Sequence, residues 1–197
     1  MNKRSAEVSR KTNETDISTE IIIDGNGIYD IDTGIAFFDH MLELFSKHGL
    51  FDIKISARGD LDVDYHHTVE DVGITLGTAF DKALGERKGI IRCGLASVPM
   101  DEARVEVAVD LGGRPFVKFQ VPDNERCIKQ LPIQIFEEFF RAFAIASRMN
   151  IHIRCIFDGN THHVVESMFK SFARAMDQAS SIDPKRKDNI PSTKGVL

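Results

Sequence analysis

Apolar residues follow two periods along this chain, and segments of the two kinds succeed each other in a regular order. Six segments alternate apolar with polar residues, as half-buried strands do: residues 6–11, 17–24, 51–57, 105–110, 115–121 and 151–157. Four segments repeat apolar residues at the spacing of amphipathic helices: residues 35–47, 66–84, 133–149 and 162–180. Gly85 ends the second helix, and Asp183-Pro184 follows the fourth. A Gly112-Gly113 turn is expected to pair strands 105–110 and 115–121.

The order strand, strand, helix, strand, helix occurs twice, which indicates two repeats built alike. The last helix of each half keeps its apolar positions in step, in the pairs Leu76/Phe172, Ala79/Ala175, Phe80/Met176 and Ala83/Ala179. Such helices and strands bury their apolar faces against one another. We therefore predict an α+β fold of two tandem ββαβα-type half-domains, approximately 6–90 and 91–184, with helices packed against mixed four-stranded sheets around a pseudo-twofold axis. Both halves belong to a single globular domain, 1–197, and residues 185–197 form a C-terminal segment.

The composition narrows the class of protein. The chain has 197 residues, 42% of them hydrophobic and 28% charged, which is ordinary for a globular protein with a real core. A net charge of −5 argues against a general nucleic-acid or anionic-membrane binder, and no apolar run suits a membrane helix or a secretion signal. Cys93, Cys127 and Cys155 are odd in number and far apart, which favours reduced thiols. We expect a cytoplasmic protein.

The sequence feature with the clearest chemical meaning is a five-residue motif, His-His-x-x-Glu, that occurs twice. We call each copy a histidine word. His66-His67-Thr68-Val69-Glu70 and His162-His163-Val164-Val165-Glu166 lie 96 residues apart and use four of the seven histidines. On a helix, the first histidine and the glutamate four residues later share a face and can bind one metal ion. The second histidine points about 100° away and must serve a different partner. A single such pair is most often solvated, but two copies in phase favour metal binding.

The repeat predicts two metal sites rather than one. Aligning the halves places His40 in the first helix opposite Glu138 in the third, and both can ligate a divalent ion. We expect one site to contain His66, Glu70, His163 and Glu138. We expect the other to contain His162, Glu166, His67 and His40. Mn²⁺ is the favoured ion, because six-coordination leaves open positions for a substrate whereas zinc tends to close with four ligands.

The remaining polar residues have less distinctive spacing. His48 precedes Gly49 and can be simply a cation at the C-terminus of a helix. Lys170 lies one helical turn beyond Glu166, near the metal-binding face, whereas Arg92, Arg114 and Lys194 read by default as surface cations. Residues 190–197 contain Ser192, Thr193, Lys194 and Gly195, which can either cradle an anion or form a mobile tail.

Several motifs point to a known family when they are taken in order. They are Arg10-Lys11-Thr12-Asn13-Glu14-Thr15, Phe38-Asp39-His40-Met41-Leu42, Asp62-Val63-Asp64-Tyr65 with the first word and Asp71, Pro99-Met100-Asp101-Glu102-Ala103, Gly113-Arg114-Pro115, the second word with Ser167, and Ser192-Thr193-Lys194-Gly195-Val196. In these pieces, from Arg10 to the C-terminus, the chain closely resembles the imidazoleglycerol-phosphate dehydratases of histidine biosynthesis. Glu138 stands where many members carry His. The resemblance implies a fold of the ribosomal protein S5 domain 2-like type.

The resemblance also implies an activity. It is the manganese-dependent dehydration of imidazole glycerol phosphate to imidazole acetol phosphate, a hydro-lyase reaction. Two Mn²⁺ ions per active site would hold the substrate's imidazole ring as an imidazolate. Family members assemble as 24-subunit shells with active sites at subunit interfaces, so a homo-oligomer of this kind is expected.

Site roles follow from the same resemblance. The metal ligands match the eight positions His40, His66, His67, Glu70, Glu138, His162, His163 and Glu166. Glu14 matches an acid/base that touches the substrate, and Asp101 or Glu102, Glu70 and Glu166 are further catalytic candidates. The phosphate-binding set matches Arg92, Arg114, Lys170, Ser192, Thr193 and Lys194, and His48 joins the substrate-binding residues.

Two other functions fit a pair of metal sites. A two-metal phosphoester hydrolase would use the same ions to activate water. A metal-stapled assembly protein would use them only to join subunits. Release of inorganic phosphate would favour the first, and a site with no exchangeable coordination position would favour the second.

Overall fold

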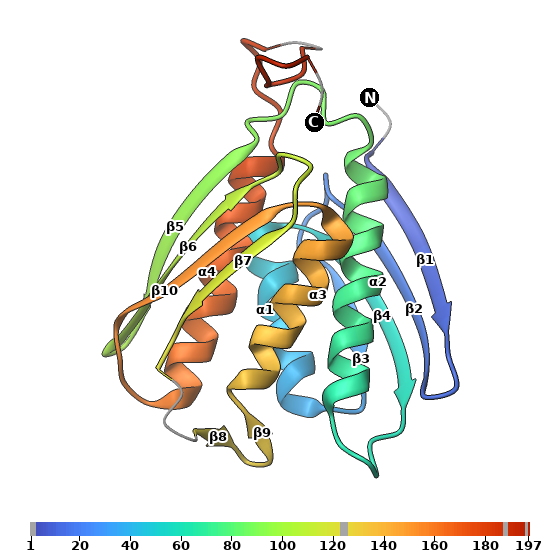
Figure 1. Cartoon of the computed structure of the whole chain (residues 1–197), viewed down its shortest axis with the longest axis vertical. Coiled ribbons are helices and arrows are strands. Elements are labelled where there is room, and N and C mark those ends of the chain that lie inside the picture. The colour runs from blue at the N-terminus through green and yellow to red at the C-terminus, as the bar shows by residue number, and fades with distance from the viewer. Residues whose placement is uncertain (1–2, 123–125, 187–188, 196) are drawn as a thin grey trace.

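The computed structural model describes residues 3–122, 126–186, 189–195 and 197, and its strands form two four-stranded mixed sheets (Figure 1). The first sheet has the order β1-β2-β4-β3, from strands β1 (Ser5–Lys11), β2 (Thr15–Ile22), β3 (Tyr29–Asp32) and β4 (Asp52–Gly59). The second has the order β5-β6-β10-β7, from β5 (Cys93–Met100), β6 (Ala103–Asp110), β7 (Phe116–Gln120) and β10 (Asn150–Phe157). A small hairpin, β8 (Cys127–Ile128) and β9 (Leu131–Pro132), precedes the third helix.

The helices form two layers between the sheets. They are α1 (Ala36–Gly49), α2 (His66–Leu84), α3 (Gln134–Ser147) and α4 (Thr161–Ser180). Helix α2 packs on β1 and β2, and α4 packs on β5 and β6. The helices of opposite halves then meet, α2 against α3 and α1 against α4 (Figure 1). The predicted α+β class, with helices on mixed four-stranded sheets, is confirmed.

The pairing of strands within each sheet differs from the expectation. Strand β6 pairs antiparallel with β5 and β10, while β7 pairs parallel with β10, so 105–110 and 115–121 are not partners. The predicted Gly112-Gly113 hairpin is therefore wrong. Each four-stranded sheet also contains one strand that was not predicted, because Cys93–Met100 and Tyr29–Asp32 gave little apolar alternation. Pro99, Ser97 and Gly94 interrupt the pattern in the former.

Equivalent elements of the two halves show the pseudo-twofold relation in detail. Strands β2 and β4 pair antiparallel and β3 and β4 parallel, as β6 and β10 and β7 and β10 do in the second half. Helices α1 and α3 both end at a non-glycine residue in the left-handed conformation, Leu50 (φ 58°) and Arg148 (φ 52°). The cap N–H of each bonds a carbonyl of the last turn, which satisfies an otherwise unpaired acceptor.

Phenylalanine side chains fill the space between the helix layers. Phe45 of α1 stacks on Phe172 of α4 with ring centroids 4.9 Å apart, and Phe139 of α3 stacks on Phe169 of α4 at 5.6 Å. All four are fully buried. Fully burying one such ring contributes about 1.5–3 kcal/mol. Helix α4, which carries the second histidine word, is thus held against α1 and α3 by buried aromatic rings.

The C-terminal segment lies at the end of the molecule where α2 and α4 finish (Figure 1). Asn189 accepts a hydrogen bond from the N–H of Gly89 (3.0 Å), and Pro191 accepts one from Arg92 Nη1 (2.8 Å). Lys187, Asp188 and Val196 of the predicted segment 185–197 lie outside the described residues. Across the described chain, no helix combines the length and apolar character needed to cross a membrane.

Candidate metal and substrate site

Both histidine words open a helix, as predicted. The N–H of His66 bonds Asp64 Oδ1 at 2.8 Å, and the N–H of His162 bonds Asn160 Oδ1 at 2.9 Å. These side-chain oxygens satisfy backbone donors that the first turn of a helix leaves unpaired. The words therefore start α2 and α4 at the same end of the molecule, away from the C-terminal segment (Figure 1).

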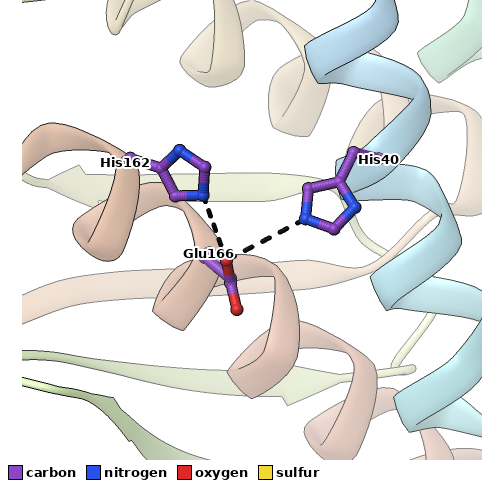
Figure 2. A group of neighbouring side chains, drawn as sticks. All are labelled: His40, His162 and Glu166. Carbon is purple, nitrogen blue, oxygen red and sulfur yellow. Dashed lines mark hydrogen bonds and ion pairs between the residues drawn. The ribbon is translucent and has the colours of Figure 1, made fainter.

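One three-residue cluster forms around the second word. Glu166 Oε2 lies 3.2 Å from His162 Nε2 and 3.9 Å from His40 Nε2 (Figure 2). One ligand atom from each of the three residues lies within 4.8 Å of the others. His40 comes from α1 in the first half, and reaches the cluster because α1 packs on α4. Three of the four residues of the predicted site His162, Glu166, His67 and His40 are thus brought together within one chain, and His67 is not among them.

The electrostatics of this cluster keep Glu166 ionised. Only 8% of the residue is exposed, and burial alone would raise the pKa of its carboxyl. The ammonium of Lys170, which forms an ion pair with Glu166 Oε1, and the hydrogen bond from His162 outweigh burial and lower that pKa. An anionic carboxylate beside two imidazoles is a donor set that suits a divalent transition-metal ion.

The first word forms a more open counterpart. His66 Nε2 lies 3.7 Å from Glu70 Oε2, and both side chains are nearly half exposed. His66 and Glu138 line one cavity of about 430 Å³, together with Tyr65, whose hydroxyl bonds Gln130 at 3.1 Å. Glu138 comes from α3, which packs on α2. In the first half His66 and Glu138 thus line one cavity. In the second half the corresponding residues, His162 and His40, belong to one cluster.

The second histidine of each word faces a different set of carboxylates. His67 Nδ1 lies 3.0 Å from Asp60 Oδ2, and His67 Nε2 lies 3.9 Å from Glu14. The hydrogen bond to Asp60 is the main reason that the pKa of His67 is raised. Within one chain, His67 therefore contacts the Asp60 and Glu14 pair instead of the Glu166 cluster.

His163 has the corresponding arrangement in the second half. Its Nδ1 lies 3.0 Å from Glu102 Oε2, and its Nε2 lies 3.8 Å from Asp101 Oδ2. Glu102 also accepts the N–H of Asn160 at 2.6 Å. The pKa of Glu102 is lowered to about 2. The largest cause is the hydrogen bond from the N–H of Asn160, followed by those from the N–H of Glu102 itself and from His163. Asp101, Glu102 and His163 form a second three-residue group that could hold an ion.

The phosphate-binding and substrate-binding candidates fall into two groups. His48 lies at the end of α1, where burial and then the charges of Lys170 and Arg174 lower its pKa. Lys170 also approaches Met100 Sδ at 3.6 Å. These two candidates therefore belong to the neighbourhood of the Glu166 cluster.

The other cations lie towards the C-terminal segment. Arg92 makes a two-point ion pair with Asp110 (2.7 and 3.0 Å) and also bonds Pro191. Arg114 precedes β7, and its carbonyl accepts from Asn150. Ser192 accepts the N–H of Lys194 at 3.2 Å, and Thr193 lies between them. In one chain this group occupies the end of the molecule opposite the histidine words (Figure 1).

The sequence did not suggest Asp60 as part of the site. It follows β4 in a turn and belongs to no spacing pattern shared with the histidines. The only sequence signal was its position in the connection between strand β4 and helix α2, the helix that carries His67. Phe37, whose ring lies edge-on to His162 with centroids 5.1 Å apart, was also missed.

The fold and these clusters define a duplicated α+β protein that presents two imidazole–carboxylate clusters suited to divalent cations. Residues 33–176 match the model of the family described as imidazoleglycerol-phosphate dehydratase. A relative of that name from Caldanaerobacter subterraneus subsp. tengcongensis is 54% identical over 98% of this chain and 100% of its own, and one from Acetivibrio thermocellus is 52% identical over 98% and 99%.

Solved structures give the same result. The imidazoleglycerol-phosphate dehydratase of Staphylococcus aureus has a TM-score of 0.82 at 34% identity, covering 91% of this chain and 99% of its own. The Pyrococcus furiosus enzyme has a TM-score of 0.84 at 36% identity, covering 96% and 100%. The chain belongs to the imidazoleglycerol-phosphate dehydratase family. It is a hydro-lyase of histidine biosynthesis.

Proposed function

We propose that this hydro-lyase removes water from imidazole glycerol phosphate, giving imidazole acetol phosphate, at two Mn²⁺ ions per active site. The observation that carries the proposal is the convergence of His40, His162 and Glu166. In the first half the His66–Glu70 pair and Glu138 occupy the corresponding positions in a more open arrangement. A substrate with an imidazole ring at one end and a phosphate at the other needs metal ligands and cations in one site. The candidate residues supply both kinds of group.

The donor atoms present fit manganese. His40, His162 and Glu166 would hold one ion, and His66, Glu70 and Glu138 would hold the other, with His67 and His163 completing the sets. When bound, the ions would act as Lewis acids that hold the imidazole ring and stabilise negative charge developing on it. Imidazole and carboxylate ligands that leave coordination positions open are the chemistry such a site requires.

Proton transfer falls to carboxylates that stand free beside these histidines. The product is a ketone, so a hydroxyl leaves the carbon next to the ring and a hydrogen leaves the following carbon, after which the enol becomes the ketone. Glu14, near His67 Nε2, and Asp101, near His163 Nε2, are exposed and carry these protons. Glu70 and Glu166 act as metal ligands in the same site.

The phosphate is bound by cations and by hydroxyl and amide donors. His48 and Lys170 lie near the Glu166 cluster, whereas Arg92, Arg114, Ser192, Thr193 and Lys194 lie towards the C-terminal segment. Because the latter are at the opposite end of one chain, a neighbouring copy must present them to the metal site. Arginine and lysine would then hold the phosphate at a fixed distance from the reacting carbons.

The same separation supports a homo-oligomer with interfacial active sites. That this oligomer has 24 subunits is proposed from the family resemblance alone. His67 and His163 turn away from the clusters of their own chain, so they are available to a neighbour. Native mass spectrometry with and without a chelator tests this: loss of Mn²⁺ is expected to release small species and abolish turnover together. A chain that stays monomeric with manganese and substrate would contradict the assembly. The cytoplasmic location stays a prediction.

The activity itself is tested by following the ketone product, which absorbs in alkali, after chelation and after Mn²⁺ is added back. His162→Asn is expected to lower turnover by at least the roughly 100-fold that loss of an outer-shell partner can cost. His152→Asn, an exposed histidine on the outer face of the second sheet, is the matched control and should retain turnover. Release of inorganic phosphate with no ketone would instead establish the phosphoester hydrolase.

A further inference from the structure

His67 and His163 each have both oxygens of one carboxylate close to the ring nitrogen Nδ1. Both oxygens of Asp60 lie within reach of His67 Nδ1, at 3.2 and 3.0 Å, and both oxygens of Glu102 lie at the same two distances from His163 Nδ1. An ionised carboxylate can only accept a hydrogen bond. Nδ1 is therefore protonated in both rings, and in the neutral form of each ring Nε2 carries the free lone pair.

These two carboxylates do not come from equivalent places in the repeat. Asp60 directly follows β4, and Glu102 lies in the turn between β5 and β6. The residue that directly follows β10, Asp158, is instead held by both guanidinium nitrogens of Arg126 at 2.6 Å each. The two halves thus make the same imidazole–carboxylate contact with residues from different positions in the repeat.

The first-half counterpart of Glu102 has a different position. Glu102 directly precedes β6, as Glu14 directly precedes β2. With Asp60 on Nδ1 of His67, Glu14 stands 3.9 Å from Nε2 on the other side of the ring. In the second half Glu102 takes the Nδ1 side, and Asp101 stands 3.8 Å from Nε2.

The loop before α4 is shaped to admit Glu102. A Cβ at Gly159 would collide with the Glu102 carboxylate, so glycine leaves the room that this side chain needs. The N–H of Asn160 then donates to Glu102 Oε1 at 2.6 Å. The first half has Leu61 at the position that follows Asp60. Glu102 is therefore fixed by three separate features: its backbone partner, the glycine and the imidazole.

We propose that Asp60 and Glu102 are positioning residues that hold His67 and His163 with Nδ1 protonated and Nε2 directed outward as the metal-binding atom. The inference rests on the proposed metal site. It divides four neighbouring carboxylates into two roles, with Asp60 and Glu102 committed to the rings and Glu14 and Asp101 free to meet the substrate. Carboxylate partners of this kind orient a ligating histidine and raise its basicity.

The test measures Mn²⁺ affinity in the assembled enzyme, from the electron paramagnetic resonance signal of free Mn²⁺. Asp60→Asn and Glu102→Gln keep the shape of each side chain but remove its charge. Each is expected to weaken the binding of one of the two Mn²⁺ ions by about 10–100-fold. Asp158→Asn is the matched control, because its carboxylate touches arginine and no histidine. It should bind both ions as the unchanged protein does.

A second measurement does not depend on the metal. Nitrogen-15 shifts of the metal-free protein report the histidine tautomers: Nδ1–H is expected for His67 and His163, and a mixture of tautomers in Asp60→Asn or Glu102→Gln. Unchanged Mn²⁺ affinity with unchanged tautomers in both variants overturns the inference. Failure of the unchanged protein to bind Mn²⁺ overturns the proposed function instead, while the tautomer shifts still decide whether these carboxylates orient the rings.

Discussion

The two halves of the molecule share one topology but treat the same histidine word differently. Glu166 is buried, paired with Lys170, and joined by His40 and His162. Glu70 is nearly half exposed, Ile74 stands where the second half has Lys170, and Glu138 stands where it uses His40. The difference teaches that duplication preserved the ligand spacing while the surroundings of each cluster diverged. The two proposed ions would then be bound in unequal environments.

The packing beneath the clusters differs in the same way. Helix α2 has Gly73 and Gly77 where α4 has Phe169 and Ala173. A Cβ at Gly77 would lie 2.6 Å from the carbonyl oxygen of Phe143 and 2.9 Å from Ala146 Cβ, so α2 and α3 approach through their backbones. Helix α4 meets α1 and α3 through phenylalanine rings instead. Close backbone packing and aromatic packing thus support equivalent sites.

The strongest test of the comparison removes the carboxylate of each word. Glu166→Gln and Glu70→Gln are each expected to lower turnover by roughly 100-fold or more, because each deletes a ligand charge. Glu166→Gln should also lower the free energy of unfolding, since the mostly buried ammonium of Lys170 loses its partner. Glu137→Gln, which alters an exposed ion pair with Arg141, is the control. Turnover that survives either ligand change would show that its half-site is dispensable.

The next test concerns the close approach of α2 and α3. Gly77→Ala is expected to lower the free energy of unfolding by about 2 kcal/mol, because the added methyl overpacks a contact that has no room. Its counterpart Ala173→Gly should cost only about 1 kcal/mol, from the lower helix propensity of glycine. Denaturant unfolding at fixed protein concentration measures both. A more stable Gly77→Ala protein would mean that the helices separate without cost.

The two half-sites differ in one proposed ligand, Glu138 in the first and His40 in the second. Exchanging these residues tests whether they set the preference for Zn²⁺ or Mn²⁺. Glu138→His is expected to raise the preference of the first half-site for Zn²⁺ over Mn²⁺ on the order of tenfold, or about 1.4 kcal/mol. The reason is that imidazole suits zinc whereas carboxylate suits manganese. His40→Glu should shift the second half-site in the opposite direction. Competition between the two ions, followed by metal analysis, measures the shift, and equal ratios in both variants would contradict it.

The smallest expected effect comes from Asp158, the residue that follows β10 as Asp60 follows β4. Its hydrogen bond with Arg126 is the main cause that lowers its pKa below the ordinary 3.8. The ion pair between Asp158 and Arg126 therefore stabilises the folded protein at pH values above 3.8. This stabilisation is lost as the pH falls through the lowered pKa of Asp158. Because Asp158 is partly exposed, it contributes only about 0.5 kcal/mol. Asp158→Asn should be less stable by that amount at pH 7 and equal to the unchanged protein in strong acid, as measured by unfolding across pH.

Local spacing alone determined the two helical words and their partners on the same helix face. Because a helix places residues four apart on one face, the pairs His66 with Glu70 and His162 with Glu166 could be predicted, and the structure places both as expected. The order of the main helices and the α+β class followed from the same short-range periodicity.

Only the tertiary structure decided which distant residues meet. Alternation identifies a strand but not its neighbour, so β6 and β7 were wrongly paired although β10 lies between them. Helix packing brings His40 to Glu166, and separate loops bring Asp60 and Glu102 to the second histidines. Those contacts depend on how apolar faces stack across the whole chain, which no short window of sequence contains.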